Sequence, residues 1–431
     1  MELKIRLKKD YTNYLLSIII PITITAISIP LFKNILGAEK YGFFSITFNI
    51  LMLVAATLTG WISQSVIRLY PISNDKYSFT KKTFIIGAIT IAVFSIPVIF
   101  SFWLYKNDWI LSILFCIALF SVVFQFVALP LSQAAFLSKK NIYSELLRTI
   151  SYITVACLLL YWLPFNYMYS LFTAIIISYL LSAIYLSKQI RDSILNTPAV
   201  IGVKPEKENS LASRFLKYGA PLSLWFIFAY LLTISDKLFI MKNSGAEIQG
   251  NYQAMFDFLN KGITIFISPV AISLMPLLSA SARQAEYSKF KKLLFLILSI
   301  EVAVMFLVCI LYWCFGAAIL FKLIHIPNTR EYKLMGLFVI AGSFLWQMAI
   351  VAHKTYEIGF KSLRMLAMII VAFLFQLCFY FLYQKNHLPL IYPLGYALSA
   401  LLYFILVSVE NFKPVAGYIY NKFRNKNKLL Q

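Results

Sequence analysis

Two stretches of the chain are versions of one another: GAEKYGFFSITFNIL, from Gly37 to Leu51, and GAEIQGNYQAMFDFL, from Gly245 to Leu259. They lie 208 residues apart and share six of fifteen residues. The whole chain has 431 residues, so one segment recurs about half a chain length later. This recurrence predicts two related halves, although a Gly-rich turn that caps a helix in two places would give a similar match.

The composition indicates an integral membrane protein. Hydrophobic residues make up 61% of the chain and charged residues only 13%, whereas a soluble domain carries about 25% charged residues. Apolar runs near the ~20 residues that cross a bilayer recur from end to end, and no cleavable signal peptide pattern is present. The predicted spans are residues 12–32, 42–66, 83–105, 109–131, 145–163, 167–187, 217–240, 251–278, 293–315, 334–353, 364–384 and 390–409.

The place of the repeated segment within these spans predicts the architecture. Each copy begins after the first span of a half and continues into the second, and an even number of spans separates the copies, so both point the same way across the membrane. We therefore expect an all-α membrane protein with about 12 transmembrane helices in two parallel six-helix repeats around a central cavity. The expected parts are an N-terminal half at 1–187, a cytoplasmic linker at 188–216, a C-terminal half at 217–413 and a basic cytoplasmic tail at 414–431.

The basic residues predict the orientation. The net charge is +22, and with a cytoplasmic N-terminus 29 of the 39 Lys and Arg fall in cytoplasmic segments or in the first turn of a span that starts there, against 8 in the outer loops. This asymmetry follows the positive-inside rule and predicts that both termini and the linker are cytoplasmic. Because these residues are spread over seven short segments, we expect no nucleic-acid partner.

The cysteines and histidines do not point to a metal or cofactor. All five cysteines fall in apolar spans, where thiols are usually inert packing residues. The three histidines, His325, His353 and His387, are scattered. We expect no metal, no disulfide and no cofactor.

Charged residues inside spans are the first functional candidates, because inserting each one costs at least about 2.5–3.5 kcal/mol. Lys261 lies near the predicted midplane of its span, one turn from Asp257, on a polar stripe with Gln253, Asn260 and Thr264. Two interpretations stay open. Asp257 and Lys261 form an ion pair that neutralises both, or Lys261 meets an anionic substrate while Asp257 tunes it or binds a coupling cation.

Three acidic residues are candidates for ion coupling: Asp236, Asp257 and Glu301. Asp236 precedes Lys237, whose long side chain could extend to the outer surface. Glu301 is alone in an apolar run, which makes it a candidate proton site unless a neighbouring lysine satisfies it.

The N-terminal half carries a second polar stripe. Asn49, Gln64 and Arg68 lie close to one face of the second span, and Asn49 aligns with Asp257 at the 208-residue offset. Arg68 is either an interfacial anchor or lies at the inner mouth of a cavity, and Arg148 at the start of the fifth span has the same two interpretations. Arginine suits phosphate, because its planar fork donates two parallel hydrogen bonds.

The chain resembles the polysaccharide, or O-unit, flippases of the multidrug/oligosaccharidyl-lipid/polysaccharide exporter superfamily. The resemblance rests on LGAEKYGFFSI (Leu36–Ile46), GWISQSVIRLYP (Gly60–Pro71) and SDKLFIMKNSGAEIQGNYQAMFDF (Ser235–Phe258). In that family an Asp and a basic residue, here Asp236 and Lys237, typically precede a Gly-containing turn and an aromatic residue. The chain departs from the pattern where IQGNY replaces the more usual Gly-aromatic pair.

The resemblance implies an alternating-access flippase, not an enzyme. It would move undecaprenyl-diphosphate-linked oligosaccharide repeat units from the inner to the outer leaflet of the bacterial cytoplasmic membrane, for surface polysaccharide such as O-antigen. Its partners would be that lipid-linked glycan, membrane lipids and other polysaccharide-assembly proteins, with coupling to H⁺ or Na⁺. The expected substrate contacts are Lys261, Asn260, Thr264, Asn49, Gln64, Arg68 and Arg148.

Two alternatives remain. An ion-coupled drug or metabolite exporter of the same superfamily would favour an acidic cavity, and Lys261 and Arg68 argue against one. A membrane-embedded glycan polymerase would need a sizeable outer loop with catalytic residues, and the longest predicted outer loop, 316–333, offers little room. No nucleophile–base spacing appears elsewhere.

Overall fold

The computed structural model describes residues 2–71, 73, 75–106, 108–162, 166–195, 211–283, 287–358, 361–383 and 388–412. The middle of the expected linker, 196–210, and the expected tail, 414–431, lie outside the described residues.

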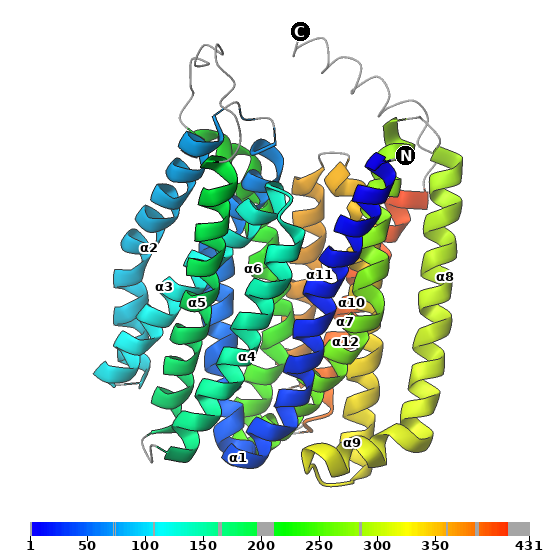
Figure 1. Ribbon diagram of the computed structural model, residues 1–431. Coiled ribbons are helices and arrows are strands. Elements are labelled where there is room, and N and C mark those ends of the chain that lie inside the picture. Colours follow the sequence, from blue (N-terminus) through cyan, green and yellow to red (C-terminus); the bar gives the residue numbers. More distant parts are fainter. Residues whose placement is uncertain are drawn as a thin grey trace. The chain divides into compact units, whose positions relative to one another are not determined.

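Within those ranges the chain forms helices joined by short turns, with no strand (Figure 1). The helices are α1 (Glu2–Leu69), α2 (Lys76–Lys106), α3 (Trp109–Ala134), α4 (Ser138–Trp162), α5 (Tyr167–Leu195), α6 (Leu211–Ser244), α7 (Ala246–Arg283), α8 (Tyr287–Leu311), η1 (Tyr312–Gly316, a single π-helical turn), α9 (Ala317–Ile324), α10 (Arg330–Ile358), α11 (Ser362–Tyr383) and α12 (Ile391–Phe412).

The first glycine of each repeated segment has a positive φ. In α1 the backbone breaks at Gly37, with φ 76° and ψ 167°, so α1 holds the first two predicted spans. Gly245 joins α6 to α7 with φ 93°. A left-handed backbone costs a residue with a Cβ atom roughly 1–2 kcal/mol, which favours glycine at both places.

Ten described helices are long and apolar enough to cross a membrane by length and composition. One of them, Ile19–Leu69, covers two predicted spans. The remaining predicted span lies in α7, whose described side chains end at Ile267. The described helices therefore agree with about 12 transmembrane helices.

Residues 316–333 differ from the predicted loop. α9 occupies the first part of this segment and buries Ala317, Leu320, Phe321 and Ile324 on one face. The apolar run AAILFKLI has the helical spacing needed to cover neighbouring side chains, which explains why it is not an extended loop.

The chain divides into two compact units. Unit 1 comprises Met1–Leu36 and Phe43–Tyr230, and unit 2 comprises Gly37–Gly42 and Leu231–Gln431. In unit 1, α3 packs against α2 and α5, and α4 packs against α5. In unit 2, α10 packs against α8 and α12, and α11 packs against α12. Because these are corresponding helices of the two halves, each unit repeats the same packing pattern.

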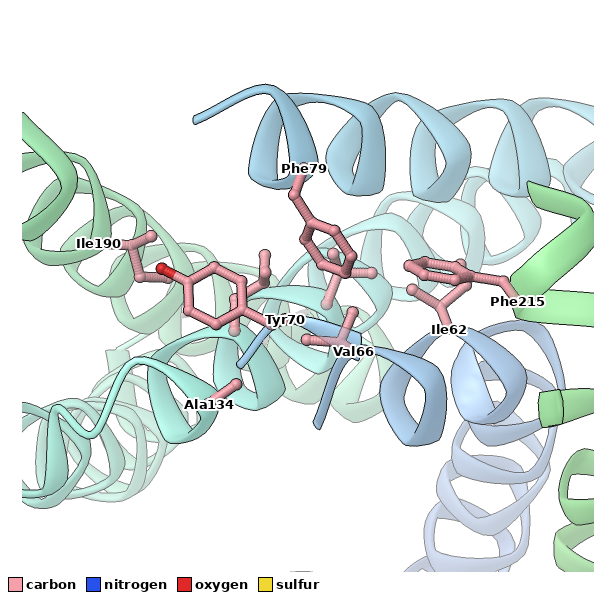
Figure 2. Close-up of a cluster of buried hydrophobic side chains, with 9 residues drawn as sticks. Ile62, Val66, Tyr70, Phe79, Ala134, Ile190 and Phe215 are labelled. Atoms are coloured by element: carbon pink, nitrogen blue, oxygen red, sulfur yellow. The ribbon is translucent and has the colours of Figure 1, made fainter. Parts of the chain in front are cut away.

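A cluster of buried side chains holds five helical segments of unit 1 together near the end of α1 (Figure 2). The rings of Tyr70 and Phe79 meet edge to face with centroids 5.6 Å apart, and Phe79 also contacts Phe215 from α6. The cluster consists of Ile62, Val66, Tyr70, Phe79, Val127, Leu131, Ala134, Ile190 and Phe215.

In unit 2 the two copies of the repeated segment contact each other. A methyl group at Gly250 would overlap the backbone carbonyl of Ala38, and one at Gly42 would overlap the side-chain oxygen of Gln249. Gly42 and Gly250 are equivalent positions in the repeat. Glycine at both positions lets residues 37–42 approach the start of α7 closely.

Candidate functional site

The predicted site residues of unit 1 centre on Arg148. The fifth span was predicted to begin at 145, but α4 begins at Ser138. Arg148 therefore lies about 15 Å along the helix axis from the first residue, at 1.5 Å per residue, and not at the end of the span. Its side chain is 21% exposed.

Arg148 is fixed by two partners. Its Nε and Nη2 donate to Oε2 of Glu145 over 3.1 and 2.7 Å, and its Nη1 donates to the hydroxyl of Tyr179 over 3.4 Å. The guanidinium carbon also lies 5.1 Å from the centre of the Tyr179 ring. These contacts use three of the five N–H donors of the guanidinium. Two donors are left for an acceptor that reaches its exposed side.

Polar side chains on α3 and α5 support this arrangement. Gln125 donates to Oε1 of Glu145 over 2.7 Å and to Oγ of Ser182 over 3.1 Å. Gln125 thus links α3, α4 and α5, as expected for an uncharged polar residue between membrane helices. This network fixes the orientation of the Arg148 fork.

The other candidates of unit 1 lie on the second half of α1. Asn49 and Gln64 are half-buried, and Arg68 is exposed in the last turn. Sδ of Met52, one turn from Asn49, is 4.0 Å from the Tyr179 hydroxyl, so this part of α1 borders the Arg148 network. Arg68 lies four turns further along α1 than Met52.

Asp257 of unit 2 is held from two sides. Its Oδ1 accepts a hydrogen bond from Nε2 of Gln253 over 2.8 Å, and its Oδ2 accepts one from the Tyr41 hydroxyl over 3.2 Å. Tyr41 belongs to the first copy of the repeated segment and Asp257 to the second. The repeated segments are therefore joined by a charge-assisted hydrogen bond as well as by the glycine contact.

Lys261 lies one turn beyond Asp257 and is half-buried. It is near the middle of α7, about 22 Å along the axis from Ala246. Asn260 beside it is also half-buried. Thr264 donates to the carbonyl of Asn260 over 2.7 Å and accepts from Nε2 of Gln347 over 3.2 Å, which ties α7 to α10.

Asp236 and Lys237 form an internal ion pair. Both are buried, at 0% and 2% exposure, with Nζ of Lys237 3.5 Å from Oδ1 of Asp236. The ammonium also donates to the carbonyl of Thr233 and lies 3.4 Å from the centre of the Phe256 ring, while Tyr252 donates to Oδ2 of Asp236. The idea that Lys237 extends to the surface was wrong, because these internal partners replace water around its charge.

Glu301 on α8 is buried, with 5% of its surface exposed. Both carboxyl oxygens lack a hydrogen-bond partner among the residues that the structure describes. No described lysine satisfies it, so of the two expectations for Glu301 the isolated carboxyl is the one observed.

The sequence analysis missed Tyr179 and Tyr41, and it included Tyr252 only as the aromatic residue of the family pattern, although each of the three holds a charged candidate. With 27 tyrosines in the chain, composition did not single them out. The one available signal was the placement of Tyr41 and Tyr252 within or beside the repeated segments.

Comparison with known proteins places the sequence in a family. A family model described as "Polysaccharide biosynthesis protein" matches residues 7–282, more than half of the chain. No curated protein matches the sequence.

Solved structures match nearly the whole chain. A multidrug resistance MATE family transporter of the MOP superfamily, in an inward-facing conformation, matches with a TM-score of 0.70 and 13% identity over 93% of this chain and 94% of that one. A MOP superfamily transporter from Pyrococcus furiosus, described as having a binding pocket of reverse polarity, matches with a TM-score of 0.69 and 14% identity over 94% of this chain and 96% of that one. A MATE transporter from Vibrio cholerae matches with a TM-score of 0.69 and 10% identity over 95% of this chain and 97% of that one. At these identities the matches show the fold, which is that of the two-repeat MOP transporters.

Proposed function

Because the chain belongs to the polysaccharide biosynthesis protein family and has the fold of MOP-superfamily transporters, we propose that it is a flippase for lipid-linked glycans. It moves undecaprenyl-diphosphate-linked oligosaccharide repeat units from the inner to the outer leaflet of the bacterial cytoplasmic membrane by alternating access. The units are then used to assemble a surface polysaccharide such as O-antigen. Both termini lie in the cytoplasm, consistent with the distribution of Lys and Arg.

The observation that supports a diphosphate cargo is the presence of a partly accessible cation within a membrane helix of each unit. Arg148 in unit 1 keeps donors for an additional acceptor, and Lys261 in unit 2 is half-buried near the middle of α7. A diphosphate leaving water must be met by positive charge, because an unpaired buried anion costs many kcal/mol. Lys261 is the main contact in this proposal, with Asn260 and Thr264 beside it.

Within unit 1, Arg148 is the side chain that we propose for binding phosphate, because two donors of its planar fork can meet phosphate oxygens. Asn49 and Gln64 hydrogen-bond the sugars, and Arg68 receives the headgroup at the cytoplasmic end of α1. The undecaprenyl chain stays in the bilayer. Asp257 holds Lys261 in check, so that the cargo is released after crossing.

Drug export is the alternative function, since multidrug transporters share the fold. A cationic drug needs an available acidic group. Asp236 is paired with Lys237 and Asp257 accepts two hydrogen bonds, so of the three acidic candidates only the buried Glu301 would be left for a cation. The Pyrococcus furiosus transporter, described as having a binding pocket whose reverse polarity suggests a different function, gives a precedent within the fold for a change of pocket polarity.

A flipping assay tests the proposal. Purified protein in vesicles containing fluorescent undecaprenyl-diphosphate-N-acetylglucosamine should make more of the label accessible to an impermeant quencher than protein-free vesicles do. Lys261→Ala should abolish this increase, and Lys261→Arg should keep part of it, because the charge survives while the geometry changes. Lys242→Ala is the matched control: this exposed lysine in the last turn of α6 should be dispensable.

Two results would contradict the proposal. One is wild-type protein that leaves the lipid-linked sugar on its original side while exporting a cationic dye. The other is a double variant, Asp257→Asn with Lys261→Gln, that flips lipid nearly normally, which would reduce Lys261 to a partner of Asp257. In cells, deletion of the gene should trap lipid-linked units on the cytoplasmic leaflet, whereas loss of a polymerase would leave them on the outer leaflet.

A further inference from the structure

Three tyrosines of unit 1 meet beside Arg148. Tyr152 lies on α4, Tyr179 on α5 and Tyr230 on α6, and we call them the tyrosine cluster. The phenol of Tyr179 interacts electrostatically with those of Tyr152 and Tyr230. Tyr179 is buried, whereas the other two are half-buried. Hydroxyl groups from three helices therefore gather at one place.

The tyrosine cluster lies far from the ends of its helices. Each of the three residues is at least about 15 Å along the axis from both ends of its helix, at 1.5 Å per residue. Tyrosines of membrane proteins are enriched at the two interfaces with water, where the ring and the hydroxyl are both accommodated. At the depth of this cluster the hydroxyls need polar partners inside the protein or on a ligand.

Neighbouring side chains fix the cluster. Nη1 of Arg148 donates to the hydroxyl of Tyr179 over 3.4 Å, and the guanidinium carbon lies 5.1 Å from the centre of the same ring. The ring of Phe32 from α1 packs against Tyr152, with centroids 5.5 Å apart. Because these rings are already held in place, a ligand that binds them loses little free energy to the ordering of side chains.

The α4 members of this site face the interior of unit 1. Arg148 and Tyr152 are one turn apart on the helix, hence on one face. The exposed apolar residues Leu147, Ile150 and Leu158 lie on a different side of α4. A ligand that reaches Arg148 and Tyr152 therefore approaches from the inside of the unit and not from the surrounding lipid.

The chemistry of the site suits a sugar beside a phosphate. Glu145 lies 2.7 Å from Arg148 and balances its charge, so the pair attracts an anion less strongly than a lone cation would. The phenols next to it carry O–H groups that both donate and accept hydrogen bonds. A sugar ring carries hydroxyls with the same two properties, and its C–H groups can lie against apolar tyrosine rings.

We propose that the tyrosine cluster binds the sugar that is attached directly to the diphosphate. This inference rests on the proposed function and names the groups that meet the first sugar. The remaining donors of Arg148 meet phosphate oxygens, and the hydroxyls of the cluster exchange hydrogen bonds with those of the sugar. Asn49, already proposed as a sugar contact, lies one turn from Met52, whose Sδ is 4.0 Å from the Tyr179 hydroxyl.

Binding of two lipids separates sugar contacts from phosphate contacts. The Kd of purified protein is measured for undecaprenyl diphosphate and for undecaprenyl-diphosphate-N-acetylglucosamine, and wild type should bind the second lipid more tightly. Tyr152→Phe and Tyr230→Phe keep the ring and remove only the hydroxyl. Each should weaken binding of the sugar-bearing lipid by about 2- to 12-fold, as expected for one hydrogen bond between neutral groups. Binding of undecaprenyl diphosphate should stay at the wild-type level.

Two further variants serve as references. Tyr143→Phe is the matched control, because Tyr143 also lies on α4 but is 60% exposed. It should bind both lipids like wild type. Arg148→Lys should weaken binding of both lipids, because it alters the phosphate contact.

The inference and the proposed function fail in distinguishable ways. Wild-type affinity of Tyr152→Phe and Tyr230→Phe for the sugar-bearing lipid would show that the cluster is not the sugar site. An equal loss for both lipids would mean that these tyrosines only position Arg148, which also overturns the inference. Equal wild-type affinity for the two lipids would refute the sugar subsite and leave the flippase standing, whereas wild-type protein that binds neither lipid would remove both proposals.

Discussion

The hydroxyl of Tyr41 donates a hydrogen bond to the carboxylate of Asp257 over 3.2 Å, although 216 residues separate them. Each lies in one copy of the repeated segment, Tyr41 four residues after Gly37 and Asp257 twelve after Gly245. They are not equivalent positions of the repeat, so this bond breaks the symmetry of the two copies. Together with the contact between Gly250 and Ala38, it fastens residues 37–42 to unit 2.

We expect Tyr41→Phe to lower the free energy of unfolding in detergent by about 1.5 kcal/mol, because it removes a hydrogen bond to a charged acceptor. Tyr77→Phe is the control, since Tyr77 is 58% exposed on α2. Asp257→Asn keeps an acceptor for Tyr41 and should cost less. Equal stability of Tyr41→Phe and wild type would show that the bond does not hold the segment.

Gly250→Ala should destabilise the protein by about 1–3 kcal/mol, the usual cost of overpacking, because the new methyl group meets the backbone carbonyl of Ala38. Gly262→Ala in the same helix is the matched control, with nothing within 4 Å of its added methyl group. It should be neutral or stabilising by up to ~1 kcal/mol through helix propensity. Thermal unfolding in detergent measures the Tm of both variants. Identical shifts in Tm would contradict the close approach of Gly250 to Ala38.

Lys237→Met should destabilise the protein by about 3–5 kcal/mol, because it leaves the carboxylate of Asp236 buried without its charge partner. Combining it with Asp236→Asn should restore most of that loss, since neither charge is then left unpaired. The double variant is thus its own control for altered packing. Chemical unfolding of the three variants measures the coupling between the two positions. Additive effects would mean that the pair does not act as a unit.

Arg148→Lys should slow lipid flipping by about tenfold, equal to about 1.4 kcal/mol, because an ammonium cannot hold Glu145 and still offer two parallel donors. Arg191→Lys is the matched control. Its side chain is 67% exposed, and its contact with Asp192 at 3.8 Å is a surface pair worth little. Full activity of Arg148→Lys would remove Arg148 from the diphosphate contacts.

The sequence alone determined the class of fold. Each apolar run of bilayer length predicts one helix, and the 208-residue offset predicts the repeat. Neither prediction requires knowing which other helices a helix packs against. The turning role of Gly37 and Gly245 could be predicted for the same reason, since a positive φ is a local property of the backbone. The sequence predicted the starts of the helices less accurately. The fifth span was expected to begin at residue 145, but α4 begins at Ser138, so Arg148 lies in the interior of its helix.

Only the tertiary structure decided which charges are paired. The sequence left open whether Lys237 reaches the surface and whether a lysine meets Glu301. In the structure Lys237 is enclosed by Asp236, Thr233 and Phe256, while Glu301 has no partner among the described residues. Likewise, nothing near Asp257 in sequence indicated Tyr41. A buried charge is stabilised by whatever lies within a few ångströms, and in a helical bundle those groups come from helices far apart in the chain. Local pattern therefore identified the candidates, and packing between helices determined their roles.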